Sequence, residues 1–225
     1  MKNPPLSLYA HLPWCVQKCP YCDFNSHAVK DDFPGDDYID MLLADLEAEL
    51  PLVWGRVVHS IFLGGGTPSL FSAAQIERLV NGVRGLLPLS PDAEVTLEAN
   101  PGTIEHDSFS AYRDAGINRV SLGIQSFSDE SLKAIGRIHG RAEAEKALDS
   151  IRASGIANFN IDLMFALPGQ SVDEALEDVR LALEARPAHL SHYQLTLEPN
   201  TAFFAKPPDL PDDDEAWEMQ SRCAE

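Results

Sequence analysis

Three cysteines stand close together near one end of the sequence. Cys15, Cys19 and Cys22 fall within the segment "CVQKCPYC", and the 225-residue chain contains one further cysteine, Cys223. The first residues lack the basic-then-apolar pattern of a secretory signal, so we expect a cytoplasmic protein whose thiols stay reduced. Reduced thiols at this spacing are suited to bind zinc or an iron–sulfur cluster. The cysteine segment therefore predicts a metal centre.

The number of thiols separates these two kinds of centre. Structural zinc sites take four protein ligands, commonly from paired C-x2-C motifs, whereas the spacing here is C-x3-C-x2-C. His11 and His27 are the nearby residues that could supply a fourth ligand, so a Cys3His zinc site is one alternative. A four-iron cluster held by three cysteines instead leaves one iron open to bind and reduce a substrate, and we favour this interpretation.

The elements that must position this segment follow a regular order. Apolar strand-like runs alternate with amphipathic helical patterns along the chain. The expected strands cover residues 6–12, 57–65, 94–100, 119–125, 158–165 and 190–198. Such alternation produces parallel strands with right-handed crossovers. A full eight-unit barrel takes roughly 250 residues, so we expect an open, partial (β/α)6 barrel, with a flat doubly wound sheet as the alternative.

The helices between these strands have recognisable ends. Residues 36–50, 72–87, 103–116, 141–155 and 171–187 carry helical patterns, and a shorter helix is expected at 129–135. Ser72 and Ser171 are suited to cap the start of a helix, and Gly116 and Gly155 to close one. We assign residues 1–210 to the core. We expect residues 211–225 to begin a helix that leads to a C-terminal domain outside this chain.

The charge argues against nucleic acid as a partner, and the hydropathy argues against a membrane-spanning helix. The formal net charge is −18, and a field of that sign repels phosphate backbones, so we expect no nucleic-acid binding and disfavour an RNA-modifying enzyme. The sequence also lacks the run of about eighteen apolar residues that a membrane-spanning helix needs.

Polar or glycine-rich residues follow every expected strand. The cysteine segment follows the first strand and "GGGT" the second, and the third, fourth and fifth end near Glu98, Gln125 and Asp162. In parallel α/β proteins the active site forms at the carboxyl ends of the strands. We therefore expect these residues to share one crevice.

A family resemblance rests on these same segments. "YAHLPWCVQKCPYC" resembles the signature of the radical S-adenosylmethionine (SAM) superfamily. The segments "FLGGGTPSLF", "LEANPGT", "GINRVSLGIQSF", "GRIHG" and "NIDLMFALPGQ" follow one another as in its coproporphyrinogen III oxidase-like branch. The resemblance implies a 4Fe-4S cluster held by Cys15, Cys19 and Cys22, with S-adenosyl-L-methionine on the open iron, where an electron breaks its sulfonium bond.

The resemblance also assigns contacts to the cofactors. The residues concerned lie at strand ends and in the following loops: Tyr9, Tyr21, Gly65, Gly66, Thr67, Glu98, Gln125, Arg137 and Asp162. In the family, the glycine turn with its threonine contacts the methionine amino group, and the arginine pairs with the methionine carboxylate. The tyrosines lie near the cluster and adenine, and the remaining polar residues contact the amino group or the ribose hydroxyls.

Each assignment has a purely structural alternative. The glycines could form a plain tight turn, and Tyr9 could be an ordinary strand aromatic. Glu98 could be a surface carboxylate, Asp162 an internal hydrogen-bond anchor, and Arg137 a solvated arginine at a helix end.

Two features distinguish the members of the branch. Coproporphyrinogen dehydrogenases usually carry a fourth cysteine two positions after the third and a long N-terminal extension. Here Cys22 is followed by Asp23 and Phe24, and the first expected strand begins at residue 6. The resemblance therefore implies a HemW-type heme chaperone, with heme as cargo.

The partners follow from that resemblance. A heme chaperone would deliver heme to respiratory hemoproteins, which can be membrane-associated, and the cluster would take electrons from a donor such as flavodoxin or ferredoxin. The alternative is an oxygen-independent coproporphyrinogen III dehydrogenase of porphyrin biosynthesis, an oxidoreductase acting on a porphyrinogen.

Overall fold

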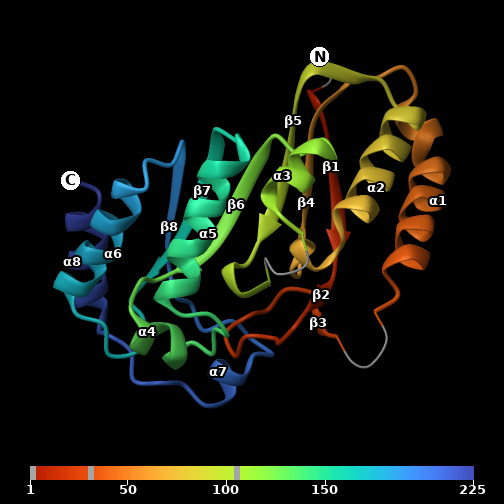
Figure 1. The fold of residues 1–225 in the computed structure, drawn as a ribbon. Helices are drawn as coiled ribbons and strands as arrows, with labels where there is room; N and C mark the ends of the chain where they lie inside the picture. The colour runs from red at the N-terminus through yellow and green to blue at the C-terminus, as the bar shows by residue number, and fades with distance from the viewer. Residues whose placement is uncertain (1–3, 30–32, 104–106) are drawn as a thin grey trace.

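One parallel sheet forms the centre of the computed structural model, which describes residues 4–29, 33–103 and 107–225 (Figure 1). Its six strands, in spatial as well as chain order, are β1 (Leu6–Leu12), β4 (Val58–Gly65), β5 (Leu89–Ala99), β6 (Arg119–Gln125), β7 (Asn158–Phe165) and β8 (His189–Gln194). A doubly wound sheet would reverse this order at a switch point. The expected partial (β/α)6 barrel is therefore confirmed, and the flat doubly wound sheet is wrong.

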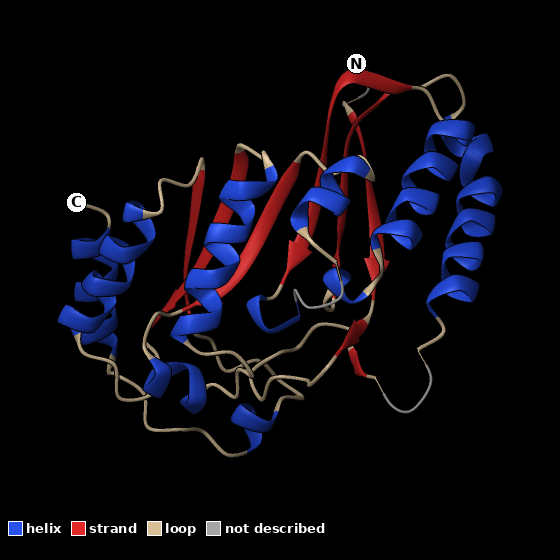
Figure 2. Cartoon of the chain, viewed as in Figure 1, coloured by secondary structure: helices blue, strands red, loops and turns tan. Residues whose placement is uncertain are grey.

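Helices connect the strands and cover the sheet (Figure 2). They are α1 (Gly35–Val53), α2 (Ala73–Leu86), α3 (Phe109–Asp114), α4 (Asp129–Ala134), α5 (Arg141–Ser154), α6 (Val172–Glu184), α7 (Ala202–Ala205) and α8 (Asp213–Cys223), with single turns of 3-10 helix at Pro68–Leu70 and Pro101–Thr103. Two short strands, β2 (Trp14–Cys15) and β3 (His27–Ala28), pair beside the cysteine segment. None of the helices in the described ranges has the length and apolarity needed to cross a membrane.

The predicted helix ends are confirmed at several residues. The Ser72 hydroxyl accepts a hydrogen bond from the Gln75 amide at 3.3 Å, and the Gln75 side chain accepts one from the Ser72 amide at 3.0 Å. Ser171 forms the same reciprocal pair at the start of α6. Gly155 closes α5 with a φ of 83°, a conformation that costs glycine little.

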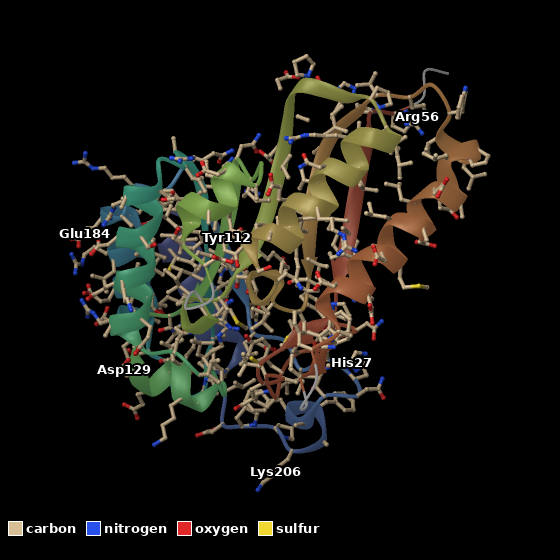
Figure 3. All side chains as sticks on the ribbon, turned by 45° about the vertical axis from the view of Figure 1, so that its right-hand side comes forward. His27, Arg56, Tyr112, Asp129, Glu184 and Lys206 are labelled. Carbon is tan, nitrogen blue, oxygen red and sulfur yellow. The ribbon has the colours of Figure 1, made fainter. Side chains whose placement is uncertain are left out.

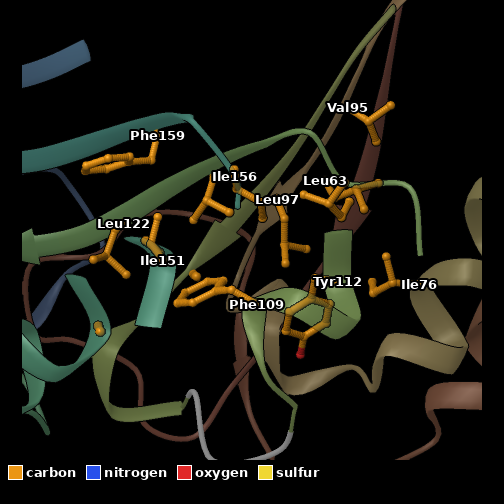
Figure 4. Close-up of a cluster of buried hydrophobic side chains, with 14 of the residues drawn as sticks. Leu63, Ile76, Val95, Leu97, Phe109, Tyr112, Leu122, Ile151, Ile156 and Phe159 are labelled. Carbon is orange, nitrogen blue, oxygen red and sulfur yellow. The ribbon is translucent and has the colours of Figure 1, made fainter. Parts of the chain in front are cut away.

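The core lies between the sheet and the helices. Leu63 of β4 is paired with Leu97 of β5, and both side chains are fully buried. Phe109 and Tyr112 from α3 pack over these strands (Figure 4). The Tyr112 hydroxyl donates to the carbonyls of Ser69 and Phe71, at 3.0 and 2.8 Å. Burying one large apolar side chain contributes about 1.5–3 kcal/mol, so this layer stabilises the packing of α3 on the sheet.

Several boundaries differ from the expectation. The last strand was expected to reach residue 198 but ends at Gln194, because its only sheet neighbour in the described chain, β7, ends at Phe165, and the last bond runs from the Leu195 amide to that carbonyl. β5 begins at Leu89, five residues before the expected start at 94. The helix expected at 103–116 forms only over α3, and residues 104–106 of that expectation lie outside the described residues.

The first and last helices also refine the expectation. Met41 has helical spacing with the apolar residues of α1, yet 67% of its surface is exposed, whereas Leu43 packs against the core. Asp36 and Asp37 lie in the first turn of α1, which begins at Gly35, and do not cap it. The expectation of a helix within residues 211–225 is confirmed by α8.

Candidate cofactor site

A cavity of about 570 Å³ lies where the carboxyl ends of the strands meet the cysteine segment. The predicted residues that line it come from the strand ends and turns, from the cysteine segment and, for Arg137, from the turn after α4: Cys15, Cys19, Tyr21, Cys22, Gly65, Gly66, Thr67, Glu98, Gln125, Arg137 and Asp162. These residues are far apart in the sequence, and consecutive parallel strands bring them together. The expectation of one shared crevice is confirmed.

The cysteine segment is held against the glycine turn at its start and by hydrogen bonds within its own loop beyond that. β2 pairs with β3, and the Trp14 carbonyl accepts a hydrogen bond from the Thr67 amide at 2.7 Å. The Lys18 ammonium joins the two sides of the loop by donating to the carbonyls of Phe24 and Ser26, at 2.9 and 3.2 Å. The thiols are therefore carried on a loop that is bonded to the turn after β4 at its start and braced internally by Lys18.

The thiols are available for binding. All four cysteines of the chain are free. Burial raises the pKa of the Cys15 thiol, while hydrogen bonds from Thr67 and Ser26 act in the opposite direction. The Cys22 sulfur lies 3.8 Å from the Ser26 hydroxyl. A bound metal would favour the thiolate that burial disfavours at Cys15.

The zinc alternative has no histidine to complete it. His11 places Nδ1 2.9 Å from the Tyr9 hydroxyl and Nε2 2.9 Å from the Asn25 carbonyl, so both ring nitrogens are engaged. His27 is exposed on β3 (Figure 3). Within the described ranges, no group of three or more histidine, cysteine or acidic side chains is placed to hold a single metal ion. Three thiols around one cavity fit a cluster, in which each sulfur binds a different iron.

The glycine turn after β4 brings its backbone against the cysteine segment. Gly65 has a φ of 115°, and a Cβ there would lie 2.5 Å from the His11 ring. A Cβ on Gly66 would lie 2.6 Å from the Trp14 carbonyl oxygen. These close approaches require glycine, and they leave the following Thr67 buried in the cavity wall.

Tyr9 lies behind this turn, outside the cavity lining. Its residue surface is 54% exposed, its ring stacks on Phe62 with centroids 6.2 Å apart, and its hydroxyl bonds to His11. Alternation along β1 places Tyr9 on the same face of the strand as His11, and the cysteine segment begins beyond the strand end. Its hydroxyl lies beside the glycine turn, where a Cβ on Gly65 would be 3.1 Å from it, so the expected contact of Tyr9 with the cofactor stays a prediction.

Two carboxylates face the cavity from neighbouring parts of the sheet. Glu98 accepts a hydrogen bond from the Gly65 amide at 3.1 Å, yet burial, together with the negative charge of Asp162, raises its pKa to about 7. Asp162 accepts 2.8 Å hydrogen bonds from the Ser121 hydroxyl and from the side-chain amide of Asn160. Glu98 is therefore not a plain surface carboxylate, and both groups keep acceptor capacity for a ligand's hydroxyl or amino groups.

Gln125 and Arg137 line the cavity at the end of β6, the strand that lies between those of Glu98 and Asp162. The Tyr193 hydroxyl donates to Gln125 Oε1 at 2.7 Å. Arg137 donates from Nη2 to the Gly123 carbonyl at 2.7 Å and places Nη1 3.8 Å from the Cys19 sulfur. Its Nε is buried with no hydrogen-bond partner among the described residues. The solvated-arginine alternative is therefore wrong, and the unpaired N–H fits an acceptor on a ligand.

The cavity also contains residues that the sequence analysis did not assign. Tyr193 lies beside Tyr21 and Arg137, and burial raises the pKa of both tyrosines while the charge of Arg137 opposes it. No alternation pattern in the sequence indicates Tyr193, because Gln194 and Leu195, which follow it, also line the cavity.

Comparison with known proteins agrees with this geometry. The sequence profile of the Radical SAM superfamily matches residues 9–182. The heme chaperone HemW of Escherichia coli (strain K12) is 58% identical over 97% of this chain, which covers 58% of that protein. The heme chaperone HemW of Haemophilus influenzae is 55% identical, with the same two shares. The chain thus spans less than two thirds of the length of these relatives.

Solved structures share the fold. Coproporphyrinogen III oxidase (HemN) from Escherichia coli, a radical SAM enzyme, superposes with a TM-score of 0.86 at 32% identity, over 97% of this chain and 51% of that one. Streptococcus suis SuiB bound to S-adenosylmethionine gives a TM-score of 0.63 at 16% identity, over 98% and 47% of the two chains, a likeness of fold alone. Since the profile match runs from β1 into α6, the chain belongs to the Radical SAM superfamily.

Proposed function

We propose that this chain is the cofactor-binding core of a radical SAM heme chaperone. Membership of the superfamily implies a 4Fe-4S cluster and S-adenosylmethionine. The observation that carries the proposal is the meeting of three free thiols with the polar strand ends in one cavity. When bound, the cluster supplies the electron that cleaves the sulfonium of S-adenosylmethionine.

The residues of the cavity suit the ends of that ligand. Arg137 has a buried, unpaired N–H and a planar fork suited to the methionine carboxylate. Glu98 offers an acceptor beside the backbone of Gly65, where an amino group would fit. Asp162 and Gln125 offer acceptors for ribose hydroxyls, and Tyr21 an aromatic surface for adenine.

The chaperone assignment rests on the relatives and on the cysteine segment. The two heme chaperones are more similar to this chain than the 32% identical coproporphyrinogen III oxidase is. Asp23 and Phe24 stand where a dehydrogenase usually carries a further cysteine. We further propose that the protein works in the cytoplasm, takes electrons from a flavodoxin or ferredoxin, and delivers heme to respiratory hemoproteins. In this proposal, residues 1–210 form the radical SAM core, α8 leads into a C-terminal domain, and the heme-binding groups lie in that further part of the relatives.

The first experiment tests the cluster. Anaerobically reconstituted protein is expected to be brown and to bind about four irons. Replacing Cys15, Cys19 or Cys22 with alanine should abolish the colour, whereas Cys223→Ala, a thiol outside the cavity, should retain it. A colourless protein that binds zinc would contradict the proposal.

The second experiment separates the two functions. The full-length protein is incubated with coproporphyrinogen III, S-adenosylmethionine and a reductant, and separately with heme. Heme binding without porphyrinogen turnover supports the chaperone. Formation of protoporphyrinogen IX would establish the dehydrogenase instead.

A further inference from the structure

The carboxyl end of β6 has an unusual backbone. The pairing of β6 with β7 shifts between Gly123 and Gln125, so that Ile124 is the extra residue of a bulge. Gln125 has a φ of 70°, a region that side chains other than glycine seldom occupy. We call residues 123–127 the β6 turn. The strained residue of this turn lines the cavity together with Gly123, and strain held at a binding wall needs support from its surroundings.

The side chains of Arg137 and His139 hold the first half of the β6 turn through its carbonyl groups. Arg137 donates to the Gly123 carbonyl, and His139 Nε2 lies 3.1 Å from the Ile124 carbonyl. Because a carbonyl only accepts, His139 carries its hydrogen on Nε2. Burial and the charge of Arg137 lower the pKa of His139 to about 4, so its ring is neutral. The carbonyls of the bulge are thereby fixed in direction.

A buried carboxylate holds the second half. Asp178 of α6 accepts hydrogen bonds from the Ser126 hydroxyl and the Phe127 amide, both at 2.7 Å, and a longer one of 3.4 Å from the Gln170 side chain. Asp178 is 4% exposed and Ser126 fully buried. Burial raises the pKa of Asp178 to about 6. Burying a carboxylate costs desolvation free energy, and the hydrogen bonds from Ser126 and Phe127 offset part of that cost.

We infer that Asp178 is a positioning residue for S-adenosylmethionine, which acts through Ser126 and Phe127 to hold the β6 turn so that Gln125 faces the cavity. Asp178 itself lies outside the cavity lining, one layer behind Gln125. The inference rests on the proposed function, because it requires Gln125 to contact the ligand.

A double-mutant cycle tests this role. Cluster-reconstituted wild-type protein, Asp178→Ala, Gln125→Ala and the double variant are compared for their dissociation constants for S-adenosylmethionine by equilibrium dialysis. Asp178→Ala should weaken binding roughly tenfold or more, as loss of outer partners does at metal sites, with iron content unchanged. The double variant should bind no more weakly than Gln125→Ala, since both substitutions act on one contact.

Two further variants separate positioning from general destabilisation. Asp178→Asn keeps an acceptor for the Phe127 amide and can donate to the Ser126 hydroxyl, so it should restore most of the affinity. Leu79→Ala, a buried core substitution in α2, controls for lost stability. Should Asp178→Ala not fold, Ser126→Ala removes one hydroxyl from the same contact and takes its place in the cycle.

The possible results are distinct. Equal binding by Asp178→Ala and Leu79→Ala, or independent losses from Asp178→Ala and Gln125→Ala that add, would overturn the positioning role while leaving the proposed function intact. A wild-type protein that carries its cluster but does not bind S-adenosylmethionine would refute both.

Discussion

Buried groups of opposite charge define the cavity at the scale of single residues. Arg137 lies between the Cys19 sulfur and the Gly123 carbonyl, while Glu98 and Asp162 face the same space from β5 and β7. A ligand that carries both an amino group and a carboxylate would satisfy both sides at once. The arrangement supports a zwitterionic ligand more than a simple anion, which the two carboxylates would repel.

The first prediction concerns the pH dependence caused by Glu98. Its pKa in the folded protein is about 7, above the ordinary 4.5, mainly because of burial. The stabilising contribution of its protonated form is therefore complete below pH 4.5 and is lost as the pH rises through 7. In the ligand-free protein, Glu98→Gln should thus raise the free energy of unfolding relative to wild type by about 1–3 kcal/mol at pH 8 and by little at pH 4.5.

Urea unfolding at both pH values measures this difference, and the comparison with wild type cancels the other titrating groups. Glu77→Gln, on the exposed side of α2, is the matched control and should show the same difference at both pH values. A Glu98→Gln effect that does not change with pH would contradict the assignment.

At the scale of elements, helix caps and strand pairing fix where the site residues stand. The reciprocal Ser72 and Gln75 pair begins α2 directly after the 3-10 turn that follows the glycine turn of β4. The cap therefore contributes both to helix stability and to the position of the preceding turn.

The second prediction concerns this cap. Ser72→Ala leaves the Gln75 amide without its acceptor and should lower the free energy of unfolding by about 1 kcal/mol. Ser72→Asp keeps an acceptor at the helix start. Because aspartate and serine are about equally favoured as N-caps, its free energy of unfolding should stay within roughly a few tenths of a kcal/mol of wild type. Thermal unfolding of the three proteins provides the measurement. Equal losses in both variants would show that the cap bond does not stabilise the helix.

The sequence predicted most of these elements, for identifiable reasons. Apolar runs and capping residues are local signals, so the interior strands and the starts of α2 and α6 could be located. The end of β8 depends on the length of its neighbour β7, and α7 has only four residues, so neither has a local signal. The positive φ of Gln125 and the burial of Asp178 arise from tertiary contacts that no spacing indicates.

At the scale of the whole molecule, the strand order produces the site. Because six parallel strands lie side by side in chain order, each strand end or the loop that follows it adds residues to the same cavity. The charge of −18 is distributed over this frame, and its ion pairs are largely exposed pairs such as Arg141 with Glu145, which contribute little to stability. The fold thus depends on its apolar layer, and the polar strand ends are left free for a ligand.

The most direct test of the account is the electron paramagnetic resonance spectrum of the reduced, reconstituted protein before and after addition of S-adenosylmethionine. We expect the signal of a reduced 4Fe-4S cluster, and a change in that signal when the ligand binds the open iron. The same spectrum should be absent from Cys19→Ala. A cluster signal that S-adenosylmethionine leaves unchanged, or one that survives the loss of Cys19, would contradict the assignment of this cavity.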